Sequence, residues 1–318
     1  MASLAPEEAI AAPRATQLWD IAPTGPWSLA LHGGAGGRIA ELAAEDRAAF
    51  EAGLAHAYGA GRAVLVAGGS ALDAVCATVV QLEDDPLFNA GRGAALTTDG
   101  EVELDAAVMD GTGVAGAIAA SRHARNPVQL ARAVMERSAH LFLVHPTREL
   151  VERWSLATAE QEYFITDARV AQLQRILDAG LVAPRHGTVG AVARDAAGTV
   201  AAATSTGGMA NQEDGRVGDA PVIGAGTYAR NGAAAISCTG EGEAFIRGVV
   251  SHDIVARMRY LGAELPDAVR ATIQEALTEQ HASGGLVSVD GDGRVVVAHN
   301  SPTMFAAFDD GTGLVLRT

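Results

Sequence analysis

Lysine is absent from this 318-residue sequence, in which arginine supplies all 23 basic side chains. Without a lysine amine the chain cannot form a Schiff base with a carbonyl substrate, nor bind pyridoxal phosphate in that way. It also lacks the lysine that a P-loop places on a triphosphate and the catalytic lysine of protein kinases. The absence therefore excludes several large classes of enzyme.

Cysteine and basic charge are scarce as well. Cys76 and Cys238 are too few for a disulfide framework or a paired-cysteine zinc site, and they are typical of small buried residues in a reducing cytoplasm. The net charge of −15 argues against a nucleic-acid partner and an anionic membrane surface. No apolar run reaches 18 residues, and residues 1–25 lack the pattern of a signal peptide. We expect a cytoplasmic protein with neither a nucleic-acid nor a membrane partner.

The glycine turn after the first expected strand and the histidines do not match common site signatures. The glycine turn at 33–37 does not have the G-x-G-x-x-G spacing of a dinucleotide site. Neither the G-x-S-x-G serine elbow nor the H-E-x-x-H zinc motif occurs, and we assign no metal to the nine histidines. The glycine turn is compatible with a plain strand-to-helix connection or with a backbone that lies close to a ligand.

The apolar pattern predicts strands in both halves of the chain, with helices after each set. Tight turns join several strands, including a hairpin of 188–195 and 199–205, which favours an α+β fold, an αββα sandwich, over parallel βαβ units. Residues 1–26 are expected to form a loose tail, and 139–187 a weakly patterned connection with one helix. The other expected strands lie at 27–32, within 94–120, and at 232–239, 285–289, 294–298, 303–308 and 313–316; the expected helices lie at 42–65, 70–82, 126–138, 168–180, 241–260 and 266–280.

The motif HGTVG at 186–190 places a threonine directly after a glycine, at the end of the weakly patterned connection. Thr188 could be an ordinary strand residue. Alternatively, its Oγ could attack the Gly187 carbonyl and convert the peptide to an ester, which water would then cleave. The freed α-amine of Thr188, with a reference pKa of about 7.7–8.0, can accept the hydroxyl proton near pH 7. That is the N-terminal-threonine form of an activated nucleophile.

Two further motifs support the second interpretation. Thr206, in TSTGGM, ends the second hairpin strand, and antiparallel pairing would bring it beside Thr188. Arg216 and Asp219, in GRVGDAP, carry charges complementary to the carboxylate and ammonium of a free amino acid. The same two residues could instead form a surface ion pair.

The motif CTGEGE at 238–243 ends a buried strand and opens a helix. The Thr239 hydroxyl and a backbone N–H at the helix start, at Gly240, could form an oxyanion hole. Thr239 could also be a simple helix N-cap with Glu243 nearby. The motif alone does not decide between the two.

The order of these motifs closely resembles the plant-type (type 2) L-asparaginase / isoaspartyl peptidase family of N-terminal-nucleophile (Ntn) hydrolases. HGGAGG at 32–37 and EDDPLFNAGRGA at 83–94 match the first half of the family pattern, and the resemblance spans about residues 27–310. It implies hydrolysis of L-asparagine and β-aspartyl dipeptides through an ester on Thr188. It also implies a four-layer αββα sandwich made of two subunits that arise by cleavage at Gly187–Thr188.

The resemblance further implies an α subunit at 27–187, a β subunit at 188–318 and association of two such pairs as (αβ)2. Thr188 is then the nucleophile with its freed amine as the general base. The resemblance also implies that Thr206 orients or activates Thr188, that Thr239 Oγ and Gly240 N–H form an oxyanion hole, and that Asn89 supports the nucleophile region. It implies that Arg216 binds the substrate α-carboxylate and that Asp219, with the Gly242 backbone, binds the substrate α-amino group.

The same family pattern implies a structural Na⁺ in the loop 82–92 and no cofactor for catalysis. Oxygen ligands from a stiff loop suit such a hard cation. The expected ligands are the backbone carbonyls of Leu82, Glu83, Asp85, Phe88, Ala90 and Arg92.

Three alternative functions stay open. A glycosylasparaginase would share the threonines and the GRVGD loop, but it usually has aspartate in place of Gly187, lacks the glycine pair of TSTGGM, and is commonly secreted. A threonine endopeptidase would have no use for Arg216 and Asp219, which select a free amino-acid end. A non-catalytic amino-acid-binding relative would be expected to have lost one of the three threonines. The balance between asparaginase and isoaspartyl peptidase activity also stays open, and Glu241 could alter it.

Overall fold

The computed structural model describes residues 15–36, 43–180 and 187–318. Its strands are β1 (Gln17–Ile21), β2 (Ser28–Ala35), β3 (Leu104–Asp110), β4 (Ala115–Ser121), β5 (Phe142–Val144), β6 (Val189–Arg194), β7 (Val200–Thr206), β8 (Thr227–Ala229), β9 (Ala234–Gly240), β10 (Gly284–Asp290), β11 (Val295–His299), β12 (Met304–Asp309) and β13 (Leu314–Arg317). They form two sheets, one ordered β1-β11-β10-β9-β8 and the other β13-β12-β2-β6-β7-β3-β4-β5. Of the strand pairs in the described ranges, only β4 and β5 run parallel.

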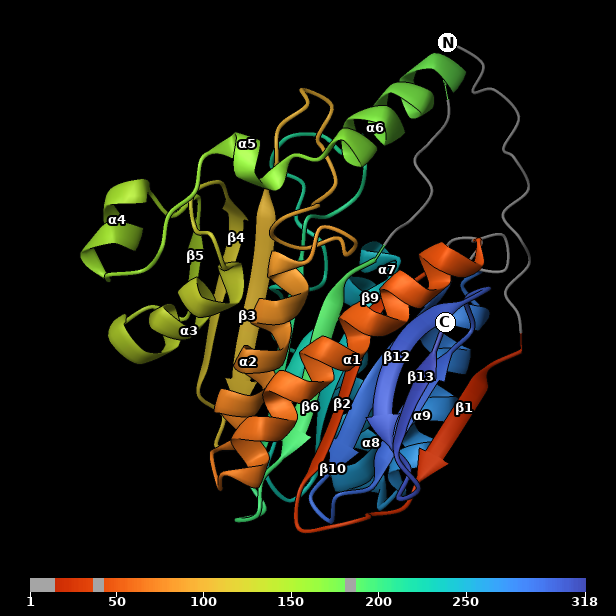
Figure 1. Cartoon of the computed structure of the whole chain (residues 1–318). Coiled ribbons are helices and arrows are strands. Elements are labelled where there is room, and N and C mark those ends of the chain that lie inside the picture. Colours follow the sequence, from red (N-terminus) through yellow and green to blue (C-terminus); the bar gives the residue numbers. More distant parts are fainter. Residues whose placement is uncertain (1–14, 37–42, 181–186) are drawn as a thin grey trace.

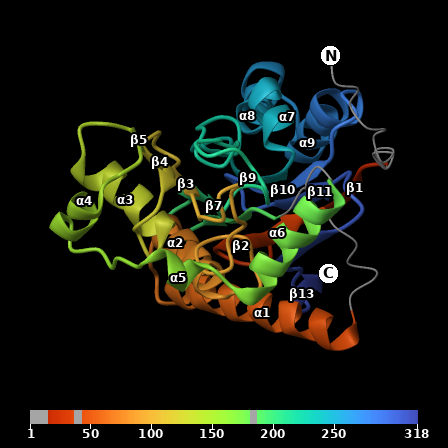
Figure 2. The same cartoon turned by 90° about the horizontal axis from the view of Figure 1, so that it is seen from above.

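The helices are α1 (Ala44–Val66), α2 (Ala71–Asp84), α3 (Pro127–Arg137), α4 (Arg148–Arg153), α5 (Gln161–Phe164), α6 (Asp167–Ala179), α7 (Gly242–Gly248), α8 (Val250–Leu261) and α9 (Leu265–Ile273). Figure 1 shows α1 and α2 lying across the strands β2 and β6. In Figure 2, α7, α8 and α9 lie on the opposite side of the strands from α1 and α2. The predicted α+β class is confirmed.

The core is divided by the two sheets. One apolar cluster, with Leu54, fills the space between α1, α2, α3 and the eight-stranded sheet. A second, with Phe245 and Ile254, lies between the five-stranded sheet and α7, α8 and α9. A third joins the facing sheets and contains many small side chains, such as Ala202 and Ala235. Small side chains allow the sheets to approach closely, which brings their strand ends together at the site described below.

Local sequence signals explain several helix ends. Ser70 caps α2 and accepts a hydrogen bond from Asp73 N–H, as expected of an N-cap serine. Pro127 occupies the first turn of α3, where its missing N–H costs nothing. Gly180 ends α6 in the left-handed conformation, at φ +60°. None of the described helices is long and apolar enough to cross a membrane.

The expected loose tail at 1–26 is wrong for Gln17–Ile21. These residues form β1, which pairs antiparallel with β11 from Gln17↔His299 to Ile21↔Val295. Only Ile21 in β1 is buried, so the strand lacks the apolar alternation that sequence analysis depends on. The first part of that tail, residues 1–14, lies outside the described residues, as do Gly37 and His186 at the ends of two motifs.

The expected helix at 241–260 is interrupted. Val249 adopts φ +45° and separates α7 from α8, because Ser251 N–H and His252 N–H bond to the carbonyls of Ala225 and Gly224. The expected helix at 266–280 is present as α9 followed directly by a π-helical turn at Gln274–Thr278. The connection at 139–187 contains β5, α4 and α5 in addition to the expected helix, α6.

Candidate active site

Two threonine hydroxyls meet at the open end of the β6–β7 hairpin. The register of Val189↔Ser205 and Gly190↔Thr204 places Thr188 opposite Thr206, as the hairpin predicted. Thr188 Oγ lies 3.3 Å from Thr206 Oγ, which also accepts a 3.0 Å hydrogen bond from Gly208 N–H. Thr188 is only 6% exposed, so its hydroxyl is oriented by protein groups rather than by bulk water.

A third threonine comes from the other sheet. Thr239, at the end of β9, is fully buried, and its Oγ accepts hydrogen bonds from Thr188 N–H at 3.3 Å and Ala35 N–H at 3.1 Å. The N-cap residue of α7 is Glu241, so the alternative interpretation of Thr239 as a helix cap is wrong. Thr188, Thr206 and Thr239 thus form one cluster of hydroxyls where the two sheets face each other.

The residue before this cluster has a backbone that suits glycine. Gly187 adopts φ +43°, in the left-handed region. Gly34, at φ +119°, approaches it so closely that a Cβ on Gly34 would lie 2.5 Å from Gly187 Cα. The turn expected at 33–37 is wrong for Gly33–Ala35, which continue β2. The glycines of HGGAGG instead bring the backbone of this strand directly against the Gly187–Thr188 peptide.

His32 is a contact residue that sequence analysis missed. Its Nδ1 lies 2.8 Å from the Thr188 carbonyl oxygen and its Nε2 lies 2.9 Å from Ser237 Oγ. Complete burial lowers the pKa of His32 to about 3, so the ring is neutral. Nδ1 then donates to the Thr188 carbonyl and Nε2 accepts from Ser237. The only sequence signal was its position beside the glycines of HGGAGG.

Asn89 connects the loop before β3 to the turn after Thr206. Its Nδ2 donates to the Gly208 carbonyl at 2.7 Å, and its Oδ1 accepts from Ala95 N–H at 2.6 Å. Its own carbonyl accepts from Gly207 N–H at 3.0 Å. Because Gly208 N–H also bonds to Thr206 Oγ, Asn89 fixes the turn that orients Thr206.

Arg216 and Asp219 converge on the start of α7. A Cβ on Gly242 would lie 3.1 Å from Arg216 Nη2 and 3.0 Å from Asp219 Oδ1. Arg216 pairs with Glu243 at 2.9 Å, and no ion pair of the described residues joins Arg216 to Asp219, which is only 3% exposed. The alternative of a surface ion pair between these two is wrong.

The Asp219 carboxyl has an oxygen that is available to bind a cationic group. Its Oδ2 is buried and has no hydrogen-bond partner among the described residues. Burial raises the pKa of Asp219 to about 7, although the neighbouring Arg216 opposes the shift. An unpaired carboxylate oxygen is costly to bury, and a ligand ammonium would satisfy it. Glu241, two residues from Glu243, instead accepts hydrogen bonds from Ser283 N–H and Oγ at 2.7 and 3.3 Å.

The loop 82–92 closes on itself. Arg92 N–H donates to the Glu83 carbonyl at 2.7 Å, and Phe88 N–H donates to the Asp85 carbonyl at 3.2 Å. The carbonyl of Leu82 has no helical donor four residues on, because that residue is Pro86. In the described ranges, no hydrogen bond ends on the carbonyls of Phe88, Ala90 or Arg92, and no group of three His, Cys, Asp or Glu side chains could hold a metal ion. A cation here would depend on backbone oxygens, and several are available.

Comparison with known proteins identifies the chain as a hydrolase. Residues 25–316 match the family described as asparaginase, and the chain belongs to that family. It is 46% identical to an isoaspartyl peptidase of Salmonella typhimurium (strain LT2) over 294 residues, which cover 88% of this chain and 94% of the relative. The isoaspartyl peptidase of Escherichia coli K12 is 42% identical (88% and 92% covered), and the isoaspartyl peptidase/L-asparaginase of Homo sapiens is 38% identical (88% and 92% covered).

Proposed function

We propose that this protein is a self-processing threonine amidohydrolase that acts on L-asparagine and β-aspartyl dipeptides. The observation that carries the proposal is the convergence of Thr188, Thr206 and Thr239 directly after a glycine in a left-handed conformation. Membership of the asparaginase family and the names of the relatives support the substrate class.

The first reaction is cleavage of the chain itself. Thr188 Oγ attacks the Gly187 carbonyl carbon, a C–O bond forms, the C–N bond breaks, and the hydroxyl proton passes to the departing amine. Water then hydrolyses the ester and leaves a carboxylate on Gly187 and a free amine on Thr188. The close contact of Gly34 with Gly187 supports a peptide held in place for this attack.

The two pieces would stay together as the α and β subunits of a four-layer αββα sandwich of the Ntn-hydrolase type. β2, from the first piece, lies between β12 and β6, which belong to the second. β3, also from the first, pairs with β7 of the second. Separation would break both sets of ladder hydrogen bonds, so the cleaved chain keeps one fold.

In the second reaction the freed Thr188 amine accepts the proton of its own Oγ, which attacks the side-chain carbonyl of the substrate. Thr239 Oγ and Gly240 N–H stabilise the oxyanion, and Thr206 orients the nucleophile. The Thr188 amine passes this proton to the leaving nitrogen, and the C–N bond breaks to release ammonia or an α-amino acid. Water then hydrolyses the β-aspartyl ester and releases aspartate. The hydrogen bond from Thr188 N–H to Thr239 Oγ supports this placement of the oxyanion hole.

The two oppositely charged side chains beside Gly242, Arg216 and Asp219, recognise the substrate. Arg216 binds the α-carboxylate, which replaces Glu243 as its partner, and Asp219 binds the α-ammonium together with the Gly242 backbone. The buried, unpaired Oδ2 of Asp219 supports this role, since an ammonium supplies the missing donor.

We further propose that a structural Na⁺ is held by the carbonyls of the loop 82–92, that two αβ pairs associate as (αβ)2, and that the protein acts in the cytoplasm. The carbonyls without hydrogen-bond donors support the first point. The two free, buried cysteines support the last.

Hydrolysis of paired dipeptides tests the proposed function. Purified wild-type protein is expected to hydrolyse L-asparagine and β-aspartyl-leucine but not α-aspartyl-leucine. Thr188→Ala is expected to hydrolyse none of them, whereas Thr188→Ser, which keeps a hydroxyl nucleophile, retains measurable activity. Activity in Thr188→Ala, or equal rates on the α and β dipeptides, would contradict the proposal.

A further inference from the structure

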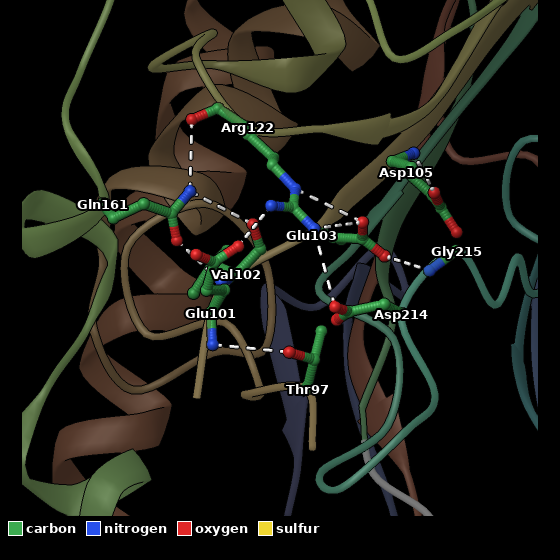
Figure 3. Close-up of polar contacts among 10 residues, drawn as sticks. Thr97, Glu101, Val102, Glu103, Asp105, Arg122, Gln161, Asp214 and Gly215 are labelled. Atoms are coloured by element: carbon green, nitrogen blue, oxygen red, sulfur yellow. Dashed lines mark hydrogen bonds and ion pairs between the residues drawn. The ribbon is translucent and has the colours of Figure 1, made fainter. Parts of the chain in front are cut away.

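Two acidic side chains at the start of β3 lie directly behind the loop that carries Arg216. Glu103 and Asp105 are two residues apart on an extended segment, so their carboxylates share one side of it. Glu103 is 2% exposed and Asp105 is also buried. Figure 3 shows the Glu103 carboxylate beside Gly215 of this loop. Neither residue belongs to the catalytic cluster described above.

Both carboxylates bind the backbone of that loop. Glu103 Oε2 accepts a 2.7 Å hydrogen bond from Gly215 N–H, and Asp105 Oδ2 accepts a 3.4 Å hydrogen bond from Gly218 N–H. Gly215 directly precedes Arg216, and Gly218 directly precedes Asp219. The segment that presents the two charges is thus fixed at both ends, by Glu103 just before β3 and by Asp105 within it.

The buried charge of Glu103 is balanced by Arg122. Arg122 Nε and Nη2 lie 3.3 and 2.9 Å from Glu103 Oε1 (Figure 3). The same guanidinium pairs with Glu101 and lies 3.9 Å from Asp214 Oδ2, in the loop itself. Two donors of one guanidinium thus hold Glu103 Oε1 in place and leave Oε2 free to accept from Gly215, and hydrogen bonds between charged groups are stronger than those between neutral ones.

Asp105 also forms a hydrogen bond with the neighbouring strand β4. Its Oδ1 accepts a 2.9 Å hydrogen bond from Ala120 N–H on β4, while Oδ2 faces the loop. One carboxyl group on β3 therefore connects β4 to Gly218. Recognition of a carboxylate and an ammonium at once needs both binding groups within a fraction of an ångström of their places. Anchors on strands supply that precision to a loop that is rich in glycine.

We propose that Glu103 and Asp105 are positioning residues that hold Arg216 and Asp219 in the geometry needed to recognise a free α-amino-acid end. The inference rests on the proposed function, because it assigns the selectivity of that same site to residues outside it. Glu103 and Asp105 touch neither the substrate nor Thr188. Loss of Glu103 should weaken substrate binding and selectivity without slowing the cleavage at Gly187–Thr188. Asp105 lies opposite Thr206 in the β3–β7 ladder and is left unchanged in the test.

The test compares two substrates of one shape, β-aspartyl-leucine with a free α-carboxylate on the aspartyl residue and the same dipeptide with that group as an α-carboxamide. Glu103→Ala is expected to raise KM for the first about 10- to 100-fold with kcat changed less than about threefold. The preference of wild-type protein for the free carboxylate should fall by the same factor. Glu103→Gln, which keeps an oxygen acceptor but no charge, should show the same pattern more weakly.

Glu101→Gln is the matched control. Glu101 pairs with the same Arg122 but is 46% exposed, and no hydrogen bond of the described residues joins its side chain to the loop. This variant is expected to keep the wild-type KM and preference. A purely structural role of Glu103 would lower the rates on both substrates by one factor and leave their ratio unchanged, which would overturn the inference, as would wild-type KM values in both Glu103 variants. Wild-type protein that hydrolyses neither substrate would instead contradict the proposed function itself.

Discussion

Protonation of Asp219 should weaken the binding of an amino-acid ligand as the pH falls through 7. Burial raises the pKa of this carboxyl to about 7, with further increases from Glu243 and Asp105 and an opposing effect of Arg216. About nine-tenths of Asp219 is then ionised at pH 8 and about one-tenth at pH 6. Because a ligand ammonium binds only the ionised form, affinity is expected to fall about tenfold between pH 8 and pH 6.

Competitive inhibition of the cleaved enzyme measures this effect. The inhibition constant of L-aspartate is compared with that of L-malate, which has a hydroxyl in place of the ammonium. Titration of the Thr188 amine affects both ligands alike, so the ratio of the two constants isolates Asp219. We expect the ratio to change about tenfold from pH 8 to pH 6 in wild-type protein and to stay constant in Asp219→Asn. A constant ratio in wild-type protein would refute the assignment of Asp219 to the ammonium.

The other predictions concern folding and processing. Asp219→Asn should unfold at a higher temperature than wild-type protein at pH 8, and this difference should shrink towards pH 5. The reason is that the pKa of Asp219 is raised in the folded state, so the folded wild-type protein becomes less stable as pH rises from about 4 to 7. Gly34→Ala, whose Cβ would lie 2.5 Å from Gly187 Cα, should slow self-cleavage about 10- to 100-fold on time-resolved gels, whereas Gly25→Ala, which meets no atom within 4 Å, should not. His32→Ala should lower the unfolding free energy in urea by about 2–4 kcal/mol, since two buried polar groups lose their partner.

The meeting of Thr188 and Thr206 was predictable because it depends on one tight hairpin. A turn at 196–198 and the period of two fix which residues face each other across the ladder. The start of α2 was predictable for a similar reason, since a cap such as Ser70 acts within one turn of the helix. Local rules were enough wherever the interacting groups lie close together in sequence.

The remaining contacts depend on long-range packing that no local pattern encodes. His32 reaches Ser237, and Glu103 reaches Gly215, across more than a hundred residues of chain. The break at Val249 was missed because a β-branched residue in a left-handed conformation goes against local preference. In that case tertiary hydrogen bonds of the following residues outweigh the helical pattern of the segment.

Self-cleavage tests the central claim most directly, because it requires both the nucleophile and the peptide bond that joins it to Gly187. Intact-mass analysis of purified wild-type protein is expected to show one fragment that ends at Gly187 and a second that starts at Thr188. Thr188→Ala, expressed and incubated in the same way, is expected to give a single uncut mass. Wild-type protein that stays whole after prolonged incubation, or Thr188→Ala cut at the same bond, would contradict Thr188 as the nucleophile.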